Sequence, residues 1–600
     1  MNPLTLDSRA SLAEAFFAIS TALPESTVYE YSSPTSGEKN SARIWKAKKY
    51  SEVRLQVLKI AAYLRSIGVT RGTRVAILSS TRPEWMEADL AIQSLGAVTV
   101  AIYQSVTTSD VGYILFDSKA QFVFAENQEQ VEKLLILISA PVAIPAFEEH
   151  AARNAQILLN AIITFERSDK NSLVNFIGDI PSPTNLESSV TDFQDISRQD
   201  LAALVYTSGT TGPPKGVMQT HGNHLSNVRQ AYQSGLFSDN TSIMLFLPLA
   251  HSFAKLMGYI GFLTTATVKF PAITNTQSSK LSPESISRDI REGSASLVPI
   301  VPRLLEKMES GISAKALAGG VMGMLVAKTI SAREGSLTHL LLAPIRNKIK
   351  NTLFGPNFIC AVSGGAKLSI DTAKFFERLQ ITVLQGYGLT ETVVATNVNR
   401  IASNRIGTVG PALAADIEIK INDAGEILFR GPNISPGYLN RPSATAAAWD
   451  AEGWFHTGDL GALSADGFLS ITGRKKELIV TSNGKKIAPE IIEQRIKANC
   501  ALISQIIMYG EGRSYNVALI TVNLEVAAKV AAKRNVKQDI EEHIKRVNKE
   551  LSNFEAIHSI HIVDEEFSIE NGLLTPTFKA KRNAVYARYA EEITALYDAK

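Results

Sequence analysis

A chain of 600 residues with 45% hydrophobic and 20% charged side chains is typical of a globular enzyme with two or more domains. The net charge of +3 argues against general nucleic-acid binding. Two distant cysteines, Cys360 and Cys500, provide neither a disulfide framework nor a zinc site, so we expect reduced thiols and a cytoplasmic location.

The N-terminal third alternates helices and apolar strands. Residues 1–45 read as an entry segment. A helix is predicted from residue 50, ending at Gly68, and another over 85–95. The strands are predicted at 74–78, 97–102 and 122–125, which indicates a largely parallel α/β sheet.

The middle of the chain adds a surface connection and a helical insert. Residues 166–199 are rich in Ser, Asp, Asn and Pro and predict the connection. Further strands are expected at 201–205, 243–247, 297–301, 358–362 and 381–384. A helical pair is predicted over about 311–352, with a basic face formed by Lys328, Arg333, Arg346, Lys348 and Lys350. This face is either simply solvated or turned to a membrane surface.

The last part of the chain divides into a β-rich region and a small terminal domain. Alternating segments at 417–421 and 426–429 predict a small antiparallel sheet or barrel. We expect a large domain over residues 1–475 and a small α+β domain over 476–600. The N-terminus lacks a signal-peptide pattern and no apolar run is long enough to span a bilayer, so any membrane contact would be peripheral, at the inner surface.

Residues 206–216, YTSGTTGPPKG, follow the predicted strand at 201–205. Hydroxyls, two flexible glycines and one lysine can surround a polyphosphate with donors and one positive charge. The order of residues is not that of a Walker A loop. A solvated turn is the alternative, which the fixed lysine and the two prolines disfavour.

Three glycine-rich polar segments, at 206–216, 363–366 and 385–391, each follow a predicted strand. Ligands of α/β sheets bind at the carboxyl ends of strands, so we expect the three loops to meet at one site.

These motifs resemble those of the adenylate-forming enzymes, which include acyl-CoA synthetases, adenylation domains and luciferases. The resemblance rests on YTSGTTGPPKG at 206–216, QGYGLTET at 385–392, WFHTGD at 454–459 and GRKKELI at 473–479, and covers roughly residues 45–590. Within that superfamily the chain is most similar to bacterial long-chain fatty-acid–CoA ligases. The segments that suggest this are LPLAHSF at 247–253, VPRLLEK at 301–307, AVSGGA at 361–366 and LTPTFKAKR at 574–582.

The resemblance implies a nucleotide site built from these motifs. The β- and γ-phosphates of ATP would be held by Thr207, Ser208, Thr210, Thr211 and Lys215, with Gly209 and Gly212 allowing close approach. Glu391 would bind Mg²⁺, with Thr207 as a second oxygen contact. Around the adenine we expect Tyr387, Gly364, Gly365 and Ala366. Gln385, Gly386 and Thr390 of the second signature are also expected to bind the cofactor. Ordinary packing is the alternative for Tyr387.

The remaining roles implied by the resemblance concern the ribose, the acid and the thiol. Asp459 would accept hydrogen bonds from the ribose with help from Arg474. His251 would lie near the reacting carboxylate, although a packed core histidine is the alternative. Lys476 would be the hinge, and Gly484 would border the path of coenzyme A.

Lys579 is implied as the catalytic lysine, with its neighbours Lys581 and Arg582 as rival candidates. The function expected is ATP- and Mg²⁺-dependent conversion of a medium-to-long-chain fatty acid to acyl-AMP and then, with coenzyme A, to acyl-CoA. Two alternatives stay open: a ligase that delivers the acyl group to a carrier-protein thiol, and a non-catalytic binding protein. Chain-length preference and oligomeric state are not encoded in these motifs.

Overall fold

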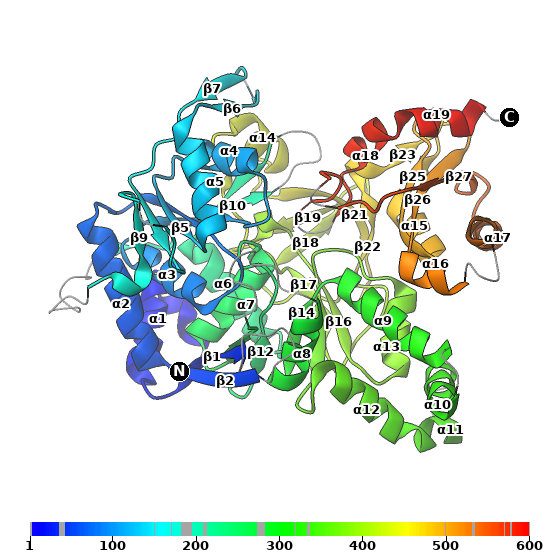
Figure 1. Ribbon diagram of the computed structural model, residues 1–600, viewed down its shortest axis with the longest axis horizontal. Coiled ribbons are helices and arrows are strands. Elements are labelled where there is room, and N and C mark those ends of the chain that lie inside the picture. Colours follow the sequence, from blue (N-terminus) through cyan, green and yellow to red (C-terminus); the bar gives the residue numbers. More distant parts are fainter. Residues whose placement is uncertain are drawn as a thin grey trace.

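A computed structural model of the protein describes residues 3–34, 43–148, 150–169, 171–181, 195–207, 213–272, 283–317, 320–332, 336–498, 500–530, 535–568, 571–575 and 579–598. Two eight-stranded sheets form the larger part of the structure, and a smaller unit follows at the C-terminal end (Figure 1).

The first sheet is mostly parallel, with antiparallel strands at both edges. In spatial order it contains β17 (Asn397–Val398), β16 (Val383–Tyr387), β15 (Cys360–Ser363), β14 (Leu297–Ile300), β12 (Ser242–Met244), β13 (Thr267–Phe270), β1 (Thr27–Pro34) and β2 (Arg43–Lys49).

The second sheet is parallel over six strands and ends in two antiparallel ones. Its order is β20 (Gly437–Tyr438), β11 (Lys215–Thr220), β10 (Leu201–Thr207), β4 (Val98–Ile102), β3 (Arg74–Leu78), β5 (Phe122–Ala125), β8 (Ala161–Thr164) and β9 (Val174–Phe176). The first strand of the phosphate-loop motif, β10, therefore lies near one edge and pairs with β11 in a hairpin.

Helices cover both sheets and fill the space between them. They are α1 (Leu12–Ala22), α2 (Tyr50–Ser66), α3 (Pro83–Ser94), α4 (Thr108–Ser118), α5 (Gln128–Ser139), α6 (His221–Gln233), α7 (Ser252–Leu263), α8 (Pro283–Gly293), α9 (Pro302–Leu317), α10 (Gly320–Ser331), α11 (Leu337–Leu341), α12 (Ala343–Phe354), α13 (Ile370–Arg378) and α14 (Pro442–Ala448). All residues of α7 are buried, as are those of α3 from Trp85 onward, which is expected of helices with packing partners on every side.

Smaller elements complete the architecture. An antiparallel sheet contains β18 (Glu418–Ile421), β19 (Glu426–Arg430), β21 (Phe455–Leu463) and β22 (Leu469–Arg474), as the sequence predicts. Two short hairpins are β6 (Val142–Ile144) with β7 (Arg153–Ala155), and β23 (Ile479–Val480) with β24 (Lys486–Ile487). Three 3₁₀ segments matter below: η1 (Pro3–Ser8), η4 (Thr390–Thr392) and η5 (Lys475–Glu477).

The C-terminal unit is a three-stranded sheet with a hydrophobic core on each face. Its strands are β25 (Ile503–Tyr509), β26 (Asn516–Val522) and β27 (Ile557–Val563), and its helices are α15 (Pro489–Lys497), α16 (Leu524–Val530), α17 (Val536–Asn548), α18 (Arg582–Arg588) and α19 (Ala590–Asp598). Figure 1 shows this unit above α9 and α13, beside the strands β21 and β22. Its contacts with the larger part include an ion pair between Lys497 and Glu306 at 2.6 Å and a hydrogen bond that Gln494 donates to the backbone oxygen of Lys367.

Most sequence-based expectations are confirmed, and several need correction. The strands at 74–78 and 122–125 are observed with the predicted bounds. The strand predicted at 243–247 is shorter in the structure, where β12 covers Ser242–Met244. The entry segment is in fact structured, since α1 buries Leu12 and Phe16 in the main core. The surface connection contributes β9 to the second sheet. The helical pair is a layer of four helices, α9 to α12, that begins already at Pro302.

The predicted basic face also changes in composition. Arg346 is only 2% exposed and its Nε donates to the side-chain oxygen of Gln380 at 3.1 Å, so it belongs to the interior of the layer. Arg333 lies outside the described residues, while Lys328 and Lys348 are exposed. Both Cys360 and Cys500 are buried free thiols, as expected. Among the described helices, none is long and apolar enough to cross a membrane.

Tight packing of α7 against β13 gives a stability prediction. A Cβ on Gly261 would lie 2.1 Å from Cγ2 of Val268, so Gly261→Ala forces a shift in the core and should cost about 1–3 kcal/mol. The matched control is Gly311→Ala in α9, where a Cβ meets no atom within 4 Å. Because alanine favours a helix more than glycine does, this change should raise the free energy of unfolding by about 0.5–1 kcal/mol. Thermal unfolding midpoints should therefore move in opposite directions; an unchanged midpoint for Gly261→Ala contradicts the packing.

Candidate active site

Asp459 is the most connected polar residue of the predicted site. It lies in β21 directly opposite Arg474 in β22, and its Oδ1 is 3.0 Å from Nε of Arg474. Its other oxygen accepts a hydrogen bond from the hydroxyl of Tyr387 at 2.6 Å. The side chain is almost fully buried. Each carboxylate oxygen has two lone pairs, so both can still accept a ligand hydroxyl.

Lys579 is brought to this cluster by the C-terminal unit. The loop that carries it is closed by hydrogen bonds between Lys579 and Thr575, whose hydroxyl accepts from the Lys579 amide at 3.0 Å. The side chain keeps contact with solvent, yet the surrounding protein lowers the pKa of its ammonium. The positive charge of Arg474 lowers that pKa further, and Asp459 opposes the change.

The two rival candidates near Lys579 are positioned differently. Arg582 forms two hydrogen bonds with the carboxylate of Glu493 in α15, and is thereby held within the C-terminal unit. Lys581 is exposed at the start of α18. Lys579 lies near enough to Asp459 and His251 for its charge to act on both groups.

His251 caps the N-terminus of α7, since its Nδ1 accepts from the amide of Phe253 at 3.1 Å. An accepting Nδ1 leaves the proton of the neutral ring on Nε2. Burial, together with a smaller effect of the nearby charge of Lys579, lowers the pKa of His251 to about 4. At neutral pH the imidazole is therefore an uncharged hydrogen-bond donor.

Lys215, Tyr438 and Glu391 form a second polar group. Lys215 opens β11 opposite Thr207 of β10, and its Nζ lies 4.9 Å from the ring centre of Tyr438. The Tyr438 hydroxyl donates to Oε1 of Glu391 at 2.7 Å. Burial lowers the pKa of Lys215, and the charge of Lys476 lowers it further. A phosphate bound beside such a lysine would stabilise the charged ammonium through a charge-assisted hydrogen bond.

The residues present fit a magnesium ion that is mostly held by its substrate. Within the described residues, no group of three His, Cys, Asp or Glu side chains could form an all-protein metal site. One oxygen of Glu391 has no hydrogen-bond partner in that part of the chain, and the hydroxyl of Thr207 lies at the end of β10. Mg²⁺ typically uses one or two carboxylates and completes its shell with phosphates and water.

Two of the glycine-rich segments have backbone conformations or close contacts that favour glycine. Gly365 has φ +83° directly after β15, and a Cβ on Gly364 would lie 3.3 Å from the ring of Phe253. A Cβ on Gly388 would be only 1.3 Å from the backbone oxygen of Val394, so no side chain fits there. Ala366 is exposed beside them.

The structure describes the other predicted residues only in part. Ser208, Gly209, Thr210, Thr211 and Gly212 lie outside the described residues. Gln385 and Gly386 pair within the sheet through β16, and the backbone oxygen of Thr390 accepts from Gln219 at 2.9 Å. Lys476 lies in η5, and Gly484 (φ +72°) forms the exposed turn between β23 and β24. Tyr387 is held by Asp459 rather than by simple packing.

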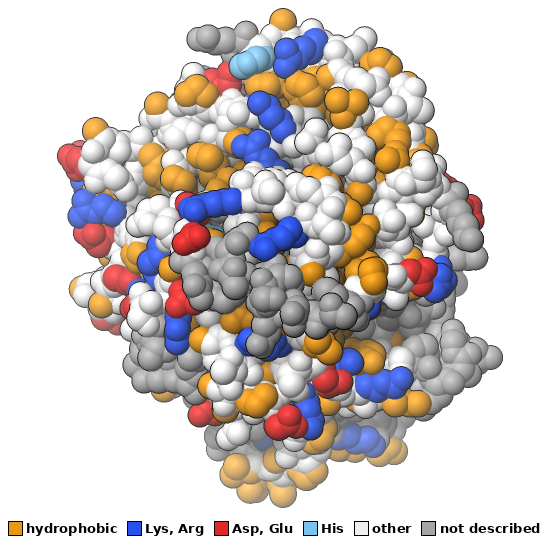
Figure 2. All heavy atoms as spheres, turned by 90° about the vertical axis from the view of Figure 1, so that its left-hand side faces the viewer, with side chains coloured by type: hydrophobic (Ala, Val, Ile, Leu, Met, Phe, Trp, Pro, Cys, Tyr) orange, Lys and Arg blue, Asp and Glu red, His pale blue; other side chains and the backbone are white. Residues whose placement is uncertain are grey.

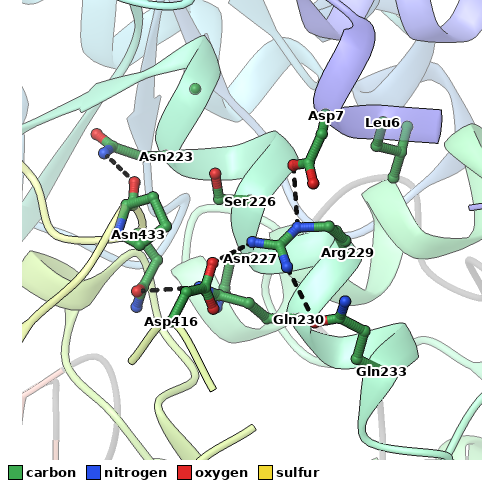
Figure 3. Close-up of polar contacts among 12 residues, drawn as sticks. Leu6, Asp7, Asn223, Ser226, Asn227, Arg229, Gln230, Gln233, Asp416 and Asn433 are labelled. Atoms are coloured by element: carbon green, nitrogen blue, oxygen red, sulfur yellow. Dashed lines mark hydrogen bonds and ion pairs between the residues drawn. The ribbon is translucent and has the colours of Figure 1, made fainter. Parts of the chain in front are cut away.

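A polar face of α6 holds the segment that contains Glu391, and the sequence alone gave no sign of it. Asn227 exchanges two hydrogen bonds with the backbone of Ala395, and Asn433, which Gln230 contacts, donates to the oxygen of Thr392. Figure 3 shows Asn227 and Gln230 of α6 on the side of the helix that faces Asp416 and Asn433. Because the partners are backbone atoms distant in sequence, no local pattern reveals them.

Arg229 extends this network to the N-terminus. Its guanidinium contacts Asp7 of η1 at 3.0 Å, as well as Asp416 and Gln233 (Figure 3). The start of the chain, the helix α6 and the antiparallel sheet are thus joined through one buried cation. Tyr438 is another residue that sequence reasoning missed, because it becomes part of the site only through the pairing of β20 with β11.

Comparison with known proteins identifies the family. The profile of the AMP-binding enzymes matches residues 32–439, and that of the AMP-binding enzyme C-terminal domain matches 476–600. The chain belongs to the AMP-binding enzyme family. Long-chain-fatty-acid–CoA ligase FadD15 of Mycobacterium tuberculosis is 32% identical, covering 92% of this chain and 93% of that protein. Fatty acyl-CoA synthetase A of Dictyostelium discoideum is 29% identical, covering 91% and 85%.

Solved structures of other enzymes share the fold. The adenylation domain of a carboxylate reductase from Mycobacterium chelonae superposes with a TM-score of 0.76 at 21% identity, covering 98% of this chain and 91% of that one. The o-succinylbenzoate CoA synthetase of Bacillus subtilis, solved with its acyl-adenylate intermediate, gives a TM-score of 0.66 at 19% identity, covering 96% and 98%.

The Tyr438–Glu391 contact yields a prediction. Tyr438→Phe keeps the ring over Lys215 but removes the hydrogen bond to the carboxylate, which should reduce ATP-dependent pyrophosphate release roughly ten- to hundredfold. Tyr597→Phe, which loses hydroxyl contacts in the C-terminal unit, is the matched control. Equal rates for the two variants would show that the contact does not orient Glu391.

Proposed function

We propose that this enzyme activates a medium-to-long-chain fatty acid with ATP and transfers it to coenzyme A. The first step forms acyl-AMP and pyrophosphate, and the second forms acyl-CoA and AMP. The observation that carries the proposal is the pair of Asp459 and Arg474 at 3.0 Å, with Lys579 of the C-terminal unit close enough for its charge to act on this pair and on His251. The names of the relatives support a fatty acid as the substrate and coenzyme A as the thiol.

In the first half-reaction an oxygen of the fatty carboxylate attacks the α-phosphorus while the bond to the leaving pyrophosphate breaks. A carboxylate is already ionised at neutral pH, so the enzyme needs no general base. The enzyme has only to position the two reactants and to stabilise the charge that develops at the phosphorus. Lys579 would stabilise the oxygens of the α-phosphate and the attacking carboxylate, and the Nε2 proton of His251 can orient the acid.

The nucleotide would be held by the two polar groups of the site. Asp459 would accept from the ribose hydroxyls, and Tyr387 and Gly364 to Ala366 would border the adenine. Lys215 and the motif residues 208–212 would hold the β- and γ-phosphates. Glu391 and Thr207 would hold Mg²⁺, which when bound neutralises charge on the phosphate oxygens.

The second half-reaction needs a path for the thiol. The sulfur of coenzyme A would form a bond to the acyl carbon as the bond to AMP breaks. We propose that the C-terminal unit, bounded at Lys476, turns between the steps, withdrawing Lys579 and bringing the turn at Gly484 to the site. Both cysteines are free thiols, which supports a cytoplasmic enzyme. Peripheral contact with the inner membrane surface is part of the proposal.

A direct assay tests the proposed reaction. The purified chain is supplied with ATP, Mg²⁺, palmitate and coenzyme A, and both pyrophosphate and thioester are measured. We expect the two products in equal amounts. Pyrophosphate without acyl-CoA would favour delivery to a carrier-protein thiol. Neither product with a series of fatty acids would contradict both enzymatic functions and leave a binding protein.

The role of Lys579 is tested by separating the half-reactions. Lys579→Ala should slow acyl-AMP formation by about a hundredfold or more, because it removes charge stabilisation at the α-phosphate. Thioester formation from supplied acyl-AMP should stay largely intact. Lys581→Ala is the matched control and should change neither step. Equal loss in both steps, or a larger loss for Lys581→Ala, would refute the assignment.

A further inference from the structure

Large apolar side chains gather on the outer surface of α10 and α11. Val321, Met324, Leu337, Leu340 and Leu341 are between 59% and 74% exposed. We call these five residues the apolar tip. They make up five of the 17 exposed large hydrophobic side chains in the described part of the chain. Figure 1 shows both helices at the lower right edge of the molecule, with α9, α12 and α13 between them and the strands.

The apolar tip belongs to a packed layer. On the other face of α10, Val326 and Thr329 are buried, and the helix contacts α9, α12 and α13. The exposed face follows from helical spacing, since Val321, Met324 and Lys328 recur at intervals of three and four residues. A concentrated exposed apolar surface on a folded layer marks an interaction site.

The layer that carries the apolar tip, α9 to α12, is rich in basic residues, of which Arg346 is buried and Arg333 lies outside the described residues. Residues 302–354 contain eight Lys and Arg and three Glu, a net charge of +5, whereas the whole chain carries only +3. The residues outside 302–354 therefore carry a net charge of −2. On the face seen in Figure 2, by contrast, basic and acidic side chains are interspersed.

The acidic groups of this layer do not neutralise its lysines. Glu306 pairs with Lys497 of the C-terminal unit, Glu309 is hydrogen-bonded to Thr372, and Glu334 lies outside the described residues. No ion pair joins the exposed Lys328 or Lys348 to any residue that the structure describes. The helices α10 and α11 contain no acidic residue.

We infer that the apolar tip and the lysines of its layer dock this enzyme onto the surface of a bilayer that contains anionic phospholipid. Apolar side chains beside lysines are what an interfacial helix presents to the headgroup region, and a negative leaflet attracts the basic residues of the layer. The cores of protein–protein interfaces are instead depleted of lysine. Docking of this kind requires no spanning helix.

Docking at this surface would serve the proposed function, on which the choice of a lipid partner rests. The layer begins at Pro302, just after β14, and α9 packs against α13, which precedes β16 and the motif at 385–392. An acid that partitions into the bilayer would thus be held close to the site that activates it. Water-soluble acids would gain nothing from docking.

Vesicle sedimentation tests the inference without ATP or substrate. The full chain is mixed with vesicles of phosphatidylcholine alone or with an equal part of phosphatidylglycerol. We expect binding to the anionic vesicles that weakens as salt is raised. A triple variant should bind the anionic vesicles at least about tenfold more weakly, because its side chains no longer insert into the apolar part of the bilayer. Its substitutions are Leu337→Gln, Leu340→Gln and Leu341→Gln. Lys328→Gln with Lys348→Gln should lose only the preference for anionic lipid.

Controls separate docking from folding and from catalysis. Leu158 and Ile136 are similarly exposed outside this layer, and their glutamine variants should bind vesicles like the wild type. The triple variant should convert dissolved octanoate at the wild-type rate and lose rate only with palmitate supplied in vesicles. Acyl-CoA formation without vesicle binding by the wild type would overturn this inference alone; binding without acyl-CoA formation would overturn the proposed function alone.

Two further outcomes overturn the inference. The triple variant could bind anionic vesicles as tightly as the wild type. Alternatively, its mass in analytical ultracentrifugation could fall from a dimer to a monomer while vesicle binding is unchanged, in which case the apolar tip is an interface between two copies of this chain.

Discussion

The carboxylate of Asp459 is the constraint on which the arrangement of the site depends. It is buried, so its charge must be compensated, and the compensation comes from Arg474 across the strand pair and from the hydroxyl of Tyr387. These partners fix the antiparallel sheet against the end of β16. The same charge, together with Glu490, offsets the repulsion between Arg474 and the approaching Lys579. One carboxylate thus joins the large part of the chain to the C-terminal unit.

The site is held in place by buried side chains that touch no expected ligand. Asn227 and Asn433 bind backbone atoms around Glu391, and Gln230 donates to the side chain of Asn433, so the position of that carboxylate depends on α6. Arg229 links the same helix to Asp7 and Asp416. Buried polar networks of this kind are costly when a single partner is lost, because the remaining groups cannot find water. A distant change in α6 is therefore felt at the phosphate site.

Local sequence signals predicted the strands and the motif loops well. The strand at 74–78 is apolar, short and followed by polar residues, and the loop motifs carry glycines where φ is positive or a side chain would clash, as at Gly365 and Gly388. These are properties that neighbouring residues determine. The family motifs then supplied the site residues.

Contacts between distant segments could not be predicted in the same way. Arg346 looked like a surface residue because its neighbours are lysines, yet tertiary packing gives it Gln380 as a partner. Tyr438 has no distinctive local pattern, and only the pairing of β20 with β11 brings it to Lys215 and Glu391. The exposed leucines of α11 resemble core residues in sequence. Only the fold reveals that they are uncovered.

A crystal structure with a non-hydrolysable acyl-adenylate analogue tests the central claim most directly. The account predicts ribose hydroxyls within hydrogen-bond distance of Asp459, the Nζ of Lys579 beside the group that replaces the α-phosphate, and the acyl carbonyl near His251. A ligand whose ribose contacts other residues, or a Lys579 side chain directed away from the bound analogue while Lys581 or Arg582 approaches it, would contradict the account.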